Sequence, residues 1–168
     1  MGLLDKLLNK DVSLLTLDVD DEDIIAIADG ELIDISTVND PVFATKVMGG
    51  GVAFKYPGNK VVLCAPANGT LSVLFPTGHA FGVTMNNGVE LLVHCGIDTV
   101  SANGDGFKVL SKKQGDNVKA GDPIIEVDLD KLSKKFDMTT MLIVTNTNDK
   151  EFNFVEAQTV KRGDSVIK

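Results

Sequence analysis

The run that decides the fold reads Thr77-Gly-His79-Ala-Phe-Gly-Val-Thr-Met-Asn86-Asn87-Gly88-Val-Glu-Leu-Leu-Val-His94-Cys-Gly-Ile-Asp98-Thr99. Two apolar segments flank an Asn-Asn-Gly turn signal, and this pattern predicts a β-hairpin. The same pattern extends outward from the hairpin. From Ile24 onward, short runs of Val, Ile, Leu, Thr and Phe alternate with Gly, Asn, Asp and Pro. The chain is therefore expected to form many short strands.

Helical spacing of apolar residues within this β-like region is confined to the brief segment Leu129 to Phe136. Many short strands with little helix favour an all-β fold, either an antiparallel β-sandwich or a flattened barrel, with at most one or two short helices. The 168 residues amount to one ordinary domain. We expect a flexible N-terminal tail over residues 1–20 and a single domain over residues 21–168.

Two pairs of similar segments, which we call the internal echoes, indicate a pseudo-repeat within the domain. Ala26–Leu32 resembles Ala65–Leu71, and Val118–Ile125 resembles Val160–Ile167. Each pair places the same strand-turn-strand unit in the chain twice. Because each unit has only two copies, the pattern predicts a pseudo-symmetric single domain rather than a solenoid, which needs at least three repeats.

The first ten residues carry Leu3, Leu4, Leu7 and Leu8 on one helical face. This segment is compatible with a frayed tail or with a short helix that lies on a membrane surface. No apolar run in the chain approaches the ~20 residues that span a bilayer. Membrane contact is therefore expected to be peripheral at most, through the N-terminal tail.

The net charge and the cysteines indicate which partners and which cellular location to expect. Sixteen Lys and Arg against 24 Asp and Glu give a formal net charge of −8. Nucleic-acid binding is not expected, because phosphate backbones are bound by clustered cations. The two cysteines, Cys64 and Cys95, stand apart without a CxxC motif, which is typical of a reduced, cytoplasmic location.

The only two histidines, His79 and His94, fall on the two arms of the predicted hairpin. A turn at residues 86–87 pairs position 79 with 94. A turn at residues 87–88 pairs position 81 with 94 and leaves His79 as the diagonal neighbour on the same face. A three-residue turn over 86–88 pairs position 80 with 94 and directs the imidazoles to opposite faces. The local sequence leaves these three registers open.

A histidine in an apolar strand is ordinarily a core residue, but two on opposing strands of one hairpin indicate a shared site. One imidazole of such a pair acts as a nucleophile while the other donates a hydrogen bond to developing charge. A closed structural zinc site takes four protein ligands, which this pair and two isolated cysteines do not supply. No cofactor is therefore expected to be required.

The segments Phe75–Gly82 and Gly88–Val100 resemble the glucose-type enzyme IIA of the bacterial phosphoenolpyruvate:sugar phosphotransferase system, also written EIIA-Glc. The resemblance covers nearly the whole chain. Four further strings match the family in order: Asp40–Phe43, Ala65–Gly69, Gly104–Phe107 and Val118–Asp122.

The resemblance implies a cytoplasmic phosphocarrier with a transient phosphohistidine. His94 would accept a phosphoryl group from the phosphocarrier protein HPr and pass it to the IIB component of a sugar permease. His79 would hydrogen-bond the phosphoryl oxygens, and Thr77 would hold the His79 ring through its other nitrogen. These three residues are the expected catalytic group.

The resemblance also implies a docking surface around the two histidines, for both HPr and IIB. The matching partner-binding positions are Asp40, Phe43, Val47, Met48, Phe75, Leu92 and Asp98. An alternative within the same family is a regulatory binding module that inhibits permeases or metabolic enzymes, such as kinases, in its unphosphorylated form. In that context a zinc ion shared with a partner would take His79 and His94 as ligands. A monomer is expected.

Overall fold

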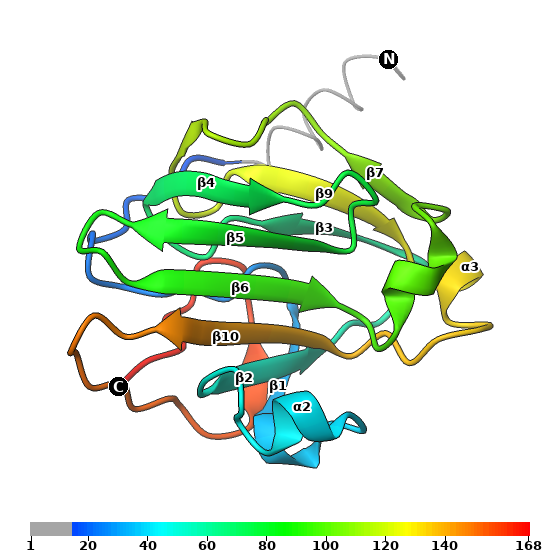
Figure 1. Cartoon of the computed structure of the whole chain (residues 1–168), viewed down its shortest axis with the longest axis horizontal. Helices are drawn as coiled ribbons and strands as arrows, with labels where there is room; N and C mark the ends of the chain where they lie inside the picture. The colour runs from blue at the N-terminus through cyan, green and yellow to red at the C-terminus, as the bar shows by residue number, and fades with distance from the viewer. Residues whose placement is uncertain (1–14) are drawn as a thin grey trace.

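The fold comes from a computed structural model and is described for residues 15–168. The prediction of an all-β, antiparallel fold is confirmed: an eight-stranded and a three-stranded sheet carry nearly all the regular structure (Figure 1). The strands are β1 (Gly30–Asp34), β2 (Gly51–Lys55), β3 (Lys60–Cys64), β4 (Gly69–Leu74), β5 (Ala80–Met85), β6 (Glu90–Cys95), β7 (Phe107–Val109), β8 (Asn117–Val118), β9 (Pro123–Asp128), β10 (Thr140–Asn146) and β11 (Gln158–Val160).

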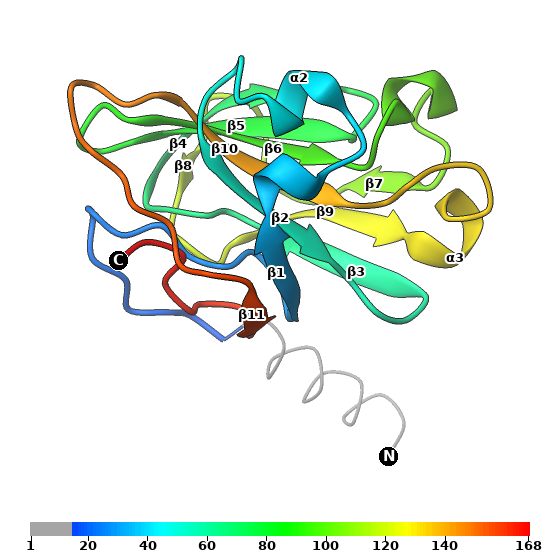
Figure 2. The same ribbon diagram turned by 90° about the horizontal axis from the view of Figure 1, so that it is seen from below.

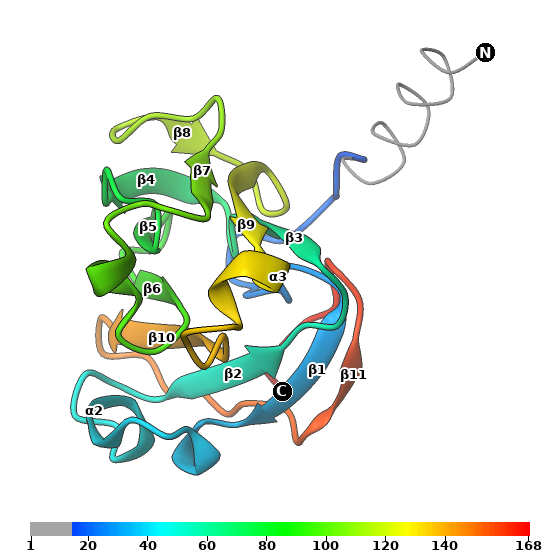
Figure 3. The same ribbon diagram turned by 90° about the vertical axis from the view of Figure 1, so that its right-hand side faces the viewer.

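The larger sheet runs in the order β11-β1-β2-β10-β6-β5-β4-β8, and the smaller one runs β3-β9-β7. Figure 2 shows β3, β9 and β7 side by side, and Figure 3 shows that the larger sheet is curved, with this smaller sheet across its open side. The main core lies between them. Leu63, Leu71, Phe81, Val93 and Ile125 are at most 1% exposed there. Burial of each such side chain stabilises the fold by roughly 1.5–3 kcal/mol.

Two four-residue α-helices, α2 (Pro41–Ala44) and α3 (Leu129–Leu132), complete the described elements together with 3-10 turns at Ile35–Thr37 and Thr99–Ala102. The α3 helix lies in the segment with helical spacing. The α2 helix was not predicted, although Asp40 followed by a proline is a start signal. In the part of the chain that the structure describes, no helix has the length and apolar character needed to cross a membrane.

The internal echoes correspond to two equivalent turns. In one copy, the Ala65 amide donates to the Asp122 carbonyl at 2.8 Å and the Gly121 amide donates to the Ala65 carbonyl at 2.8 Å. In the other copy, Ala26 makes the same two bonds with Asp164 and Gly163, at 2.7 and 3.0 Å. The repeated sequences therefore form two pseudo-symmetric turns, each closed by two backbone hydrogen bonds. We call each of these turns a clasp.

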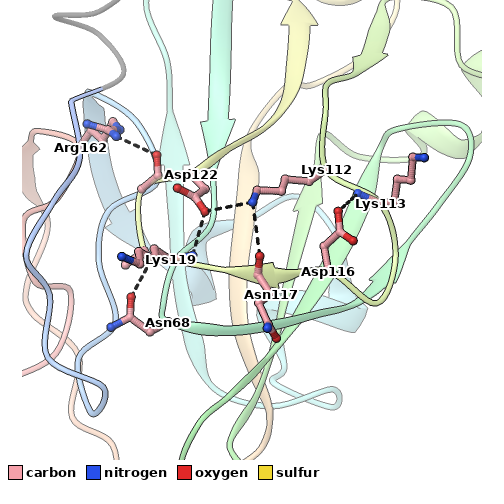
Figure 4. A network of polar contacts seen from close by, with 10 residues as sticks. Asn68, Lys112, Lys113, Asp116, Asn117, Lys119, Asp122 and Arg162 are labelled. Atoms are coloured by element: carbon pink, nitrogen blue, oxygen red, sulfur yellow. Dashed lines mark hydrogen bonds and ion pairs between the residues drawn. The ribbon is translucent and has the colours of Figure 1, made fainter.

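A side-chain network supports the first clasp (Figure 4). The Asn68 carboxamide oxygen accepts from the Ala120 amide at 2.8 Å, and the Asp122 carboxylate accepts from the Lys119 amide at 2.9 Å. Arg162 stands where the other copy has Ala120. Its guanidinium donates across to the Gly121 carbonyl at 2.7 Å. One arginine thus bridges the two clasps.

The expected tail, residues 1–20, falls largely outside the described residues, and so does the predicted amphipathic helix of the first ten. Its described part contacts the domain. Arg162 donates to the Leu15 carbonyl at 2.8 Å, and Asn68 donates to the Val19 carbonyl at 2.8 Å.

The β5–β6 hairpin adopts the three-residue turn. The Gly88 amide donates to the Met85 carbonyl at 2.9 Å, and Ala80 pairs with His94. The expectation that this register separates the imidazoles is wrong, because their ring centroids lie 5.4 Å apart. His79 precedes the first residue of β5 and follows Gly78, whose φ is +76°. The strict alternation of faces along a strand therefore does not apply to it.

Candidate functional site

The site forms where β5 begins and β6 ends. Leu91, Val93 and Cys95 point from β6 into the core, so His94 lies on the opposite face of that strand. The His79 ring is 4% exposed and meets the His94 ring edge-on, at an interplanar angle of 76°. Figure 1 shows these two strand ends side by side, with α3 and the link to β10 at the same end.

The orientation of the His94 ring is set by one backbone carbonyl. Nδ1 of His94 donates to the Gly96 oxygen at 2.8 Å. A carbonyl oxygen only accepts, so Nδ1 holds the proton and Nε2 of the neutral ring carries the lone pair. Gly96 has a φ of +81°, and a Cβ there would collide with Thr99. This turn therefore requires glycine.

The His79 ring is tied to a hydroxyl. Nδ1 of His79 lies 2.7 Å from Oγ1 of Thr77. When the hydroxyl donates to Nδ1, the proton of the neutral ring sits on Nε2 and is free to be donated outward. The site then pairs an Nε2 lone pair on His94 with an Nε2–H donor on His79.

Both imidazoles favour the neutral form. Burial lowers the pKa of His79 below its usual 6.5, and the neighbouring His94 lowers it further. Burial also lowers the pKa of His94, although the bond to Gly96 and the carboxylates of Asp40 and Asp98 act in the opposite direction. A neutral imidazole at pH 7 is a competent nucleophile.

Two aromatic rings enclose the pair. The Phe43 ring lies 5.1 Å from the His94 ring, and the Phe75 ring lies 5.1 Å from the His79 ring. Phe43 is 5% exposed, so it packs behind His94 rather than presenting a surface. Phe75 is 41% exposed and does present one.

The other docking residues that the sequence predicted differ in how exposed their side chains are. Val47 is 79% exposed and Met48 is 37% exposed. Asp98 is exposed, whereas Asp40 and Leu92 are half-buried. Asp40 caps α2, since its carboxylate accepts from the Val42 amide at 3.0 Å.

Sequence reasoning missed two exposed apolar side chains beside these residues. Val42 is 47% exposed on α2, and Val100 is 59% exposed on the turn after Asp98. Each lies two residues after an acidic residue that precedes a helical turn, but this pattern does not predict exposure, since Phe43 and Thr99 in the same turns are buried. Exposed apolar groups near a reactive pair mark a contact surface for another protein.

The site holds two nitrogen donors for a metal. Among residues 15–168, no group of three or more His, Cys, Asp or Glu side chains is placed to hold a metal ion. Cys64 and Cys95 are both free thiols buried in the core, and burial raises the pKa of Cys95 to about 12. Any metal bound at His79 and His94 would need further ligands from outside the described part of the chain.

Comparison with known proteins places this geometry in a family. Residues 22–150 match the family described as phosphoenolpyruvate-dependent sugar phosphotransferase system, EIIA 1. The glucose-specific EIIA component of Haemophilus influenzae is 39% identical over 172 residues, which cover 99% of this chain and 97% of that protein. The glucose permease IIA of Mycoplasma capricolum is 38% identical, has a TM-score of 0.80, and is matched over 86% of this chain and 93% of that one.

Other relatives are much longer. The glucose-specific EIICBA component of Staphylococcus carnosus is 43% identical over 139 residues. Those residues are 82% of this chain but only 20% of that protein. The chain therefore spans about one fifth of the length of such relatives.

Proposed function

The chain belongs to the EIIA 1 family of the phosphoenolpyruvate-dependent sugar phosphotransferase system, and on that basis we propose that His94 is its phosphoryl acceptor. As a member of this family the protein is a phosphocarrier in sugar transport. The observation that supports His94 is the bond from its Nδ1 to the Gly96 carbonyl. That bond occupies Nδ1 and leaves the Nε2 lone pair free, with the His79 ring 5.4 Å away between centroids.

The proposed step moves no proton on His94. The Nε2 lone pair attacks phosphorus, a P–N bond forms, and the bond from phosphorus to the donor breaks with its electron pair returning to the donor. The Nδ1 proton stays in its hydrogen bond to the Gly96 carbonyl oxygen, which stabilises the positive charge that the ring acquires. Positioning and charge stabilisation are the main protein contributions to such transfers.

His79 is the second member of the proposed catalytic group. Its Nε2–H donates to a phosphoryl oxygen as charge builds up there, while the Thr77 hydroxyl fixes the ring by donating to Nδ1. The two rings already lie 5.4 Å apart, so little reorganisation is needed. Because His79 is buried and His94 is half-buried, access of water to the P–N bond is limited.

The proposed partners are HPr as donor and the IIB component of a sugar permease as acceptor, in the cytoplasm. The EIICBA relatives support the second, because their names join a B part to the A part in one polypeptide. The exposed apolar residues Val47, Met48 and Phe75 supply a contact surface. The formal charge of −8 favours rapid encounter with basic partner faces.

Zinc fits the same two nitrogens in a partner complex. Because Thr77 and Gly96 occupy both Nδ1 atoms, His79 and His94 would offer Nε2, and the partner would supply the remaining ligands. Zinc would then cross-link the two proteins without taking part in phosphoryl transfer.

The test is the mass of the protein after incubation with phosphoenolpyruvate, enzyme I and HPr. The wild type should gain one acid-labile phosphoryl group. His94→Ala should gain none, and His79→Ala should gain one but fail to pass it to IIB. A wild type that gains no phosphoryl group would contradict the proposal and favour a regulatory module that works by binding alone.

A further inference from the structure

The turn that positions His94 is itself held by a loop that sequence reasoning did not single out. The Gly96 amide donates to the Thr139 carbonyl at 3.1 Å, and the Ile97 amide donates to the Asp137 carbonyl at 2.8 Å. The Gly96 peptide is thus bound on both sides, by this loop and by the His94 ring. The loop is the link from α3 to β10, which passes the end of β6 in Figure 1.

One carboxylate organises this loop. Oδ1 of Asp137 accepts from the Thr139 amide at 3.0 Å and from the Thr139 hydroxyl at 2.7 Å. Thr139 is 5% exposed, so its hydroxyl would otherwise be buried without this partner. The carboxylate therefore fixes the loop conformation that presents the two carbonyls to residues 96 and 97.

The same carboxylate reaches the other wall of the site. Oδ2 of Asp137 accepts from the Asn39 carboxamide at 3.2 Å. Asn39 precedes Asp40, which caps α2, and α2 carries the Phe43 ring that packs against His94. Asp137 thus links the segment that leads into α2 to the loop that holds the Gly96 turn.

Asp137 is ionised at neutral pH. Burial acts to raise its pKa, but the hydrogen bonds from Thr139 and Asn39 and the charge of Lys55 outweigh that effect, so the pKa lies below its ordinary value. Hydrogen bonds to a charged acceptor are stronger than neutral ones. Such bonds suit a residue that holds two segments in one arrangement.

We propose that Asp137 is a positioning residue for phosphoryl transfer, which acts by holding the Gly96 carbonyl in place to select the Nδ1–H tautomer of His94. The proposal rests on His94 being the acceptor. Asp137 makes no contact with the phosphoryl group in this account. Its main effect is therefore on the chemical step and on the state of the ring, and any smaller effect on partner binding comes through Asn39 and α2.

The first test reads the ring directly. In protein labelled with ¹⁵N at histidine, the His94 shifts of the wild type should report a proton on Nδ1. Asp137→Ala should increase the fraction with the proton on Nε2, whereas Asp137→Asn, which keeps one acceptor oxygen for Thr139, should restore most of the wild-type pattern. Unchanged His94 shifts in a folded Asp137→Ala protein would overturn the proposal. This measurement needs no phosphoryl donor. A failure of this proposal can therefore be distinguished from a failure of the proposed function.

The second test measures transfer from phospho-HPr. Asp137→Ala should lower kcat roughly tenfold and change KM less than threefold, because it misplaces the nucleophile and removes no side chain of the docking surface itself. Asp116→Ala is the matched control: Asp116 accepts from the Lys113 amide at 2.9 Å in a turn beside β8. Equal kcat values for the two variants would contradict the proposal. If Asp137→Ala does not fold, Thr139→Val removes the hydroxyl bond to Oδ1 of Asp137 and should give a smaller fall in kcat, with an unchanged kcat again counting against the proposal.

Discussion

The rings of His79 and His94 meet edge to face, with centroids 5.4 Å apart, although regular alternation in their hairpin would place them on opposite sides of the sheet. The pair exists because His79 stands just before β5, behind a glycine with positive φ. The reactive geometry is thus made where regular strand structure stops. The sheet fixes the His94 ring through β6, and the turn at Gly78 places the His79 ring beside it.

The lowered pKa values of the two imidazoles predict a specific pH response. Both rings should titrate below the usual 6.5 in a histidine NMR titration. Phosphoryl acceptance should be independent of pH above that value and fall below it, as His94 takes up a proton. Stability should follow the same direction: below pH 6.5 the unfolded chain binds more protons than the folded one, so acidification through that window weakens the fold. A midpoint above 6.5 for His94 would contradict the assignment.

Thr77 should matter for the second half-reaction more than for the first. Thr77→Val removes the hydroxyl beside Nδ1 of His79 and frees the ring to change tautomer. We expect the gain of a phosphoryl group on His94 to persist and transfer to IIB to slow roughly tenfold. Thr77→Ser keeps the hydroxyl and serves as the control. Equal transfer rates for the valine and serine variants would count against this role.

Val47 should contribute to docking without contributing to stability. Its side chain is 79% exposed, so Val47→Asn should change the free energy of unfolding by about 0.5 kcal/mol or less. The KM for phospho-HPr should rise several-fold with kcat unchanged. Leu15→Asn, which alters a 59% exposed side chain near Arg162, is the control and should leave KM unaltered. Parallel changes in both variants would show that Val47 is not part of a specific contact surface.

The two equivalent clasps should carry similar stability. Asp122 accepts from the Lys119 amide at 2.9 Å, and Asp164 accepts from the Lys161 amide at 2.8 Å. Replacing either aspartate by alanine should cost about 1 kcal/mol in urea unfolding. Neither change should affect phosphoryl acceptance, since these turns lie at the far end of β4 from His79. A loss of activity in proportion to stability would contradict this separation.

Much of this architecture could be predicted from the sequence, because it depends on local patterns. Alternating apolar runs and Gly-rich turns were sufficient for the all-β class, and the echoes at Ala26 and Ala65 corresponded to equivalent hydrogen bonds. The short α2 helix was missed because four residues do not establish a helical period. A proline after Asp40 was its only signal.

The details of the site depended on contacts between distant segments. The hairpin register could not be chosen locally, because three turn lengths fit the same Asn-Asn-Gly signal. Phe43 looked like a surface residue, yet it packs behind His94 because α2 folds back over β2 and β10. Asp137 carried no signal at all, since its role depends on bonds to Asn39, 98 positions earlier, and on carbonyls that face residues 96 and 97.

The most direct test of this account identifies the ring nitrogen that becomes phosphorylated. Protein labelled with ¹⁵N at histidine would be phosphorylated with phosphoenolpyruvate, enzyme I and HPr, and the nitrogen coupled to ³¹P would be assigned by NMR. The bond from Nδ1 to Gly96 predicts coupling to Nε2 of His94 alone. Coupling to Nδ1 of His94, or to either nitrogen of His79, would contradict it.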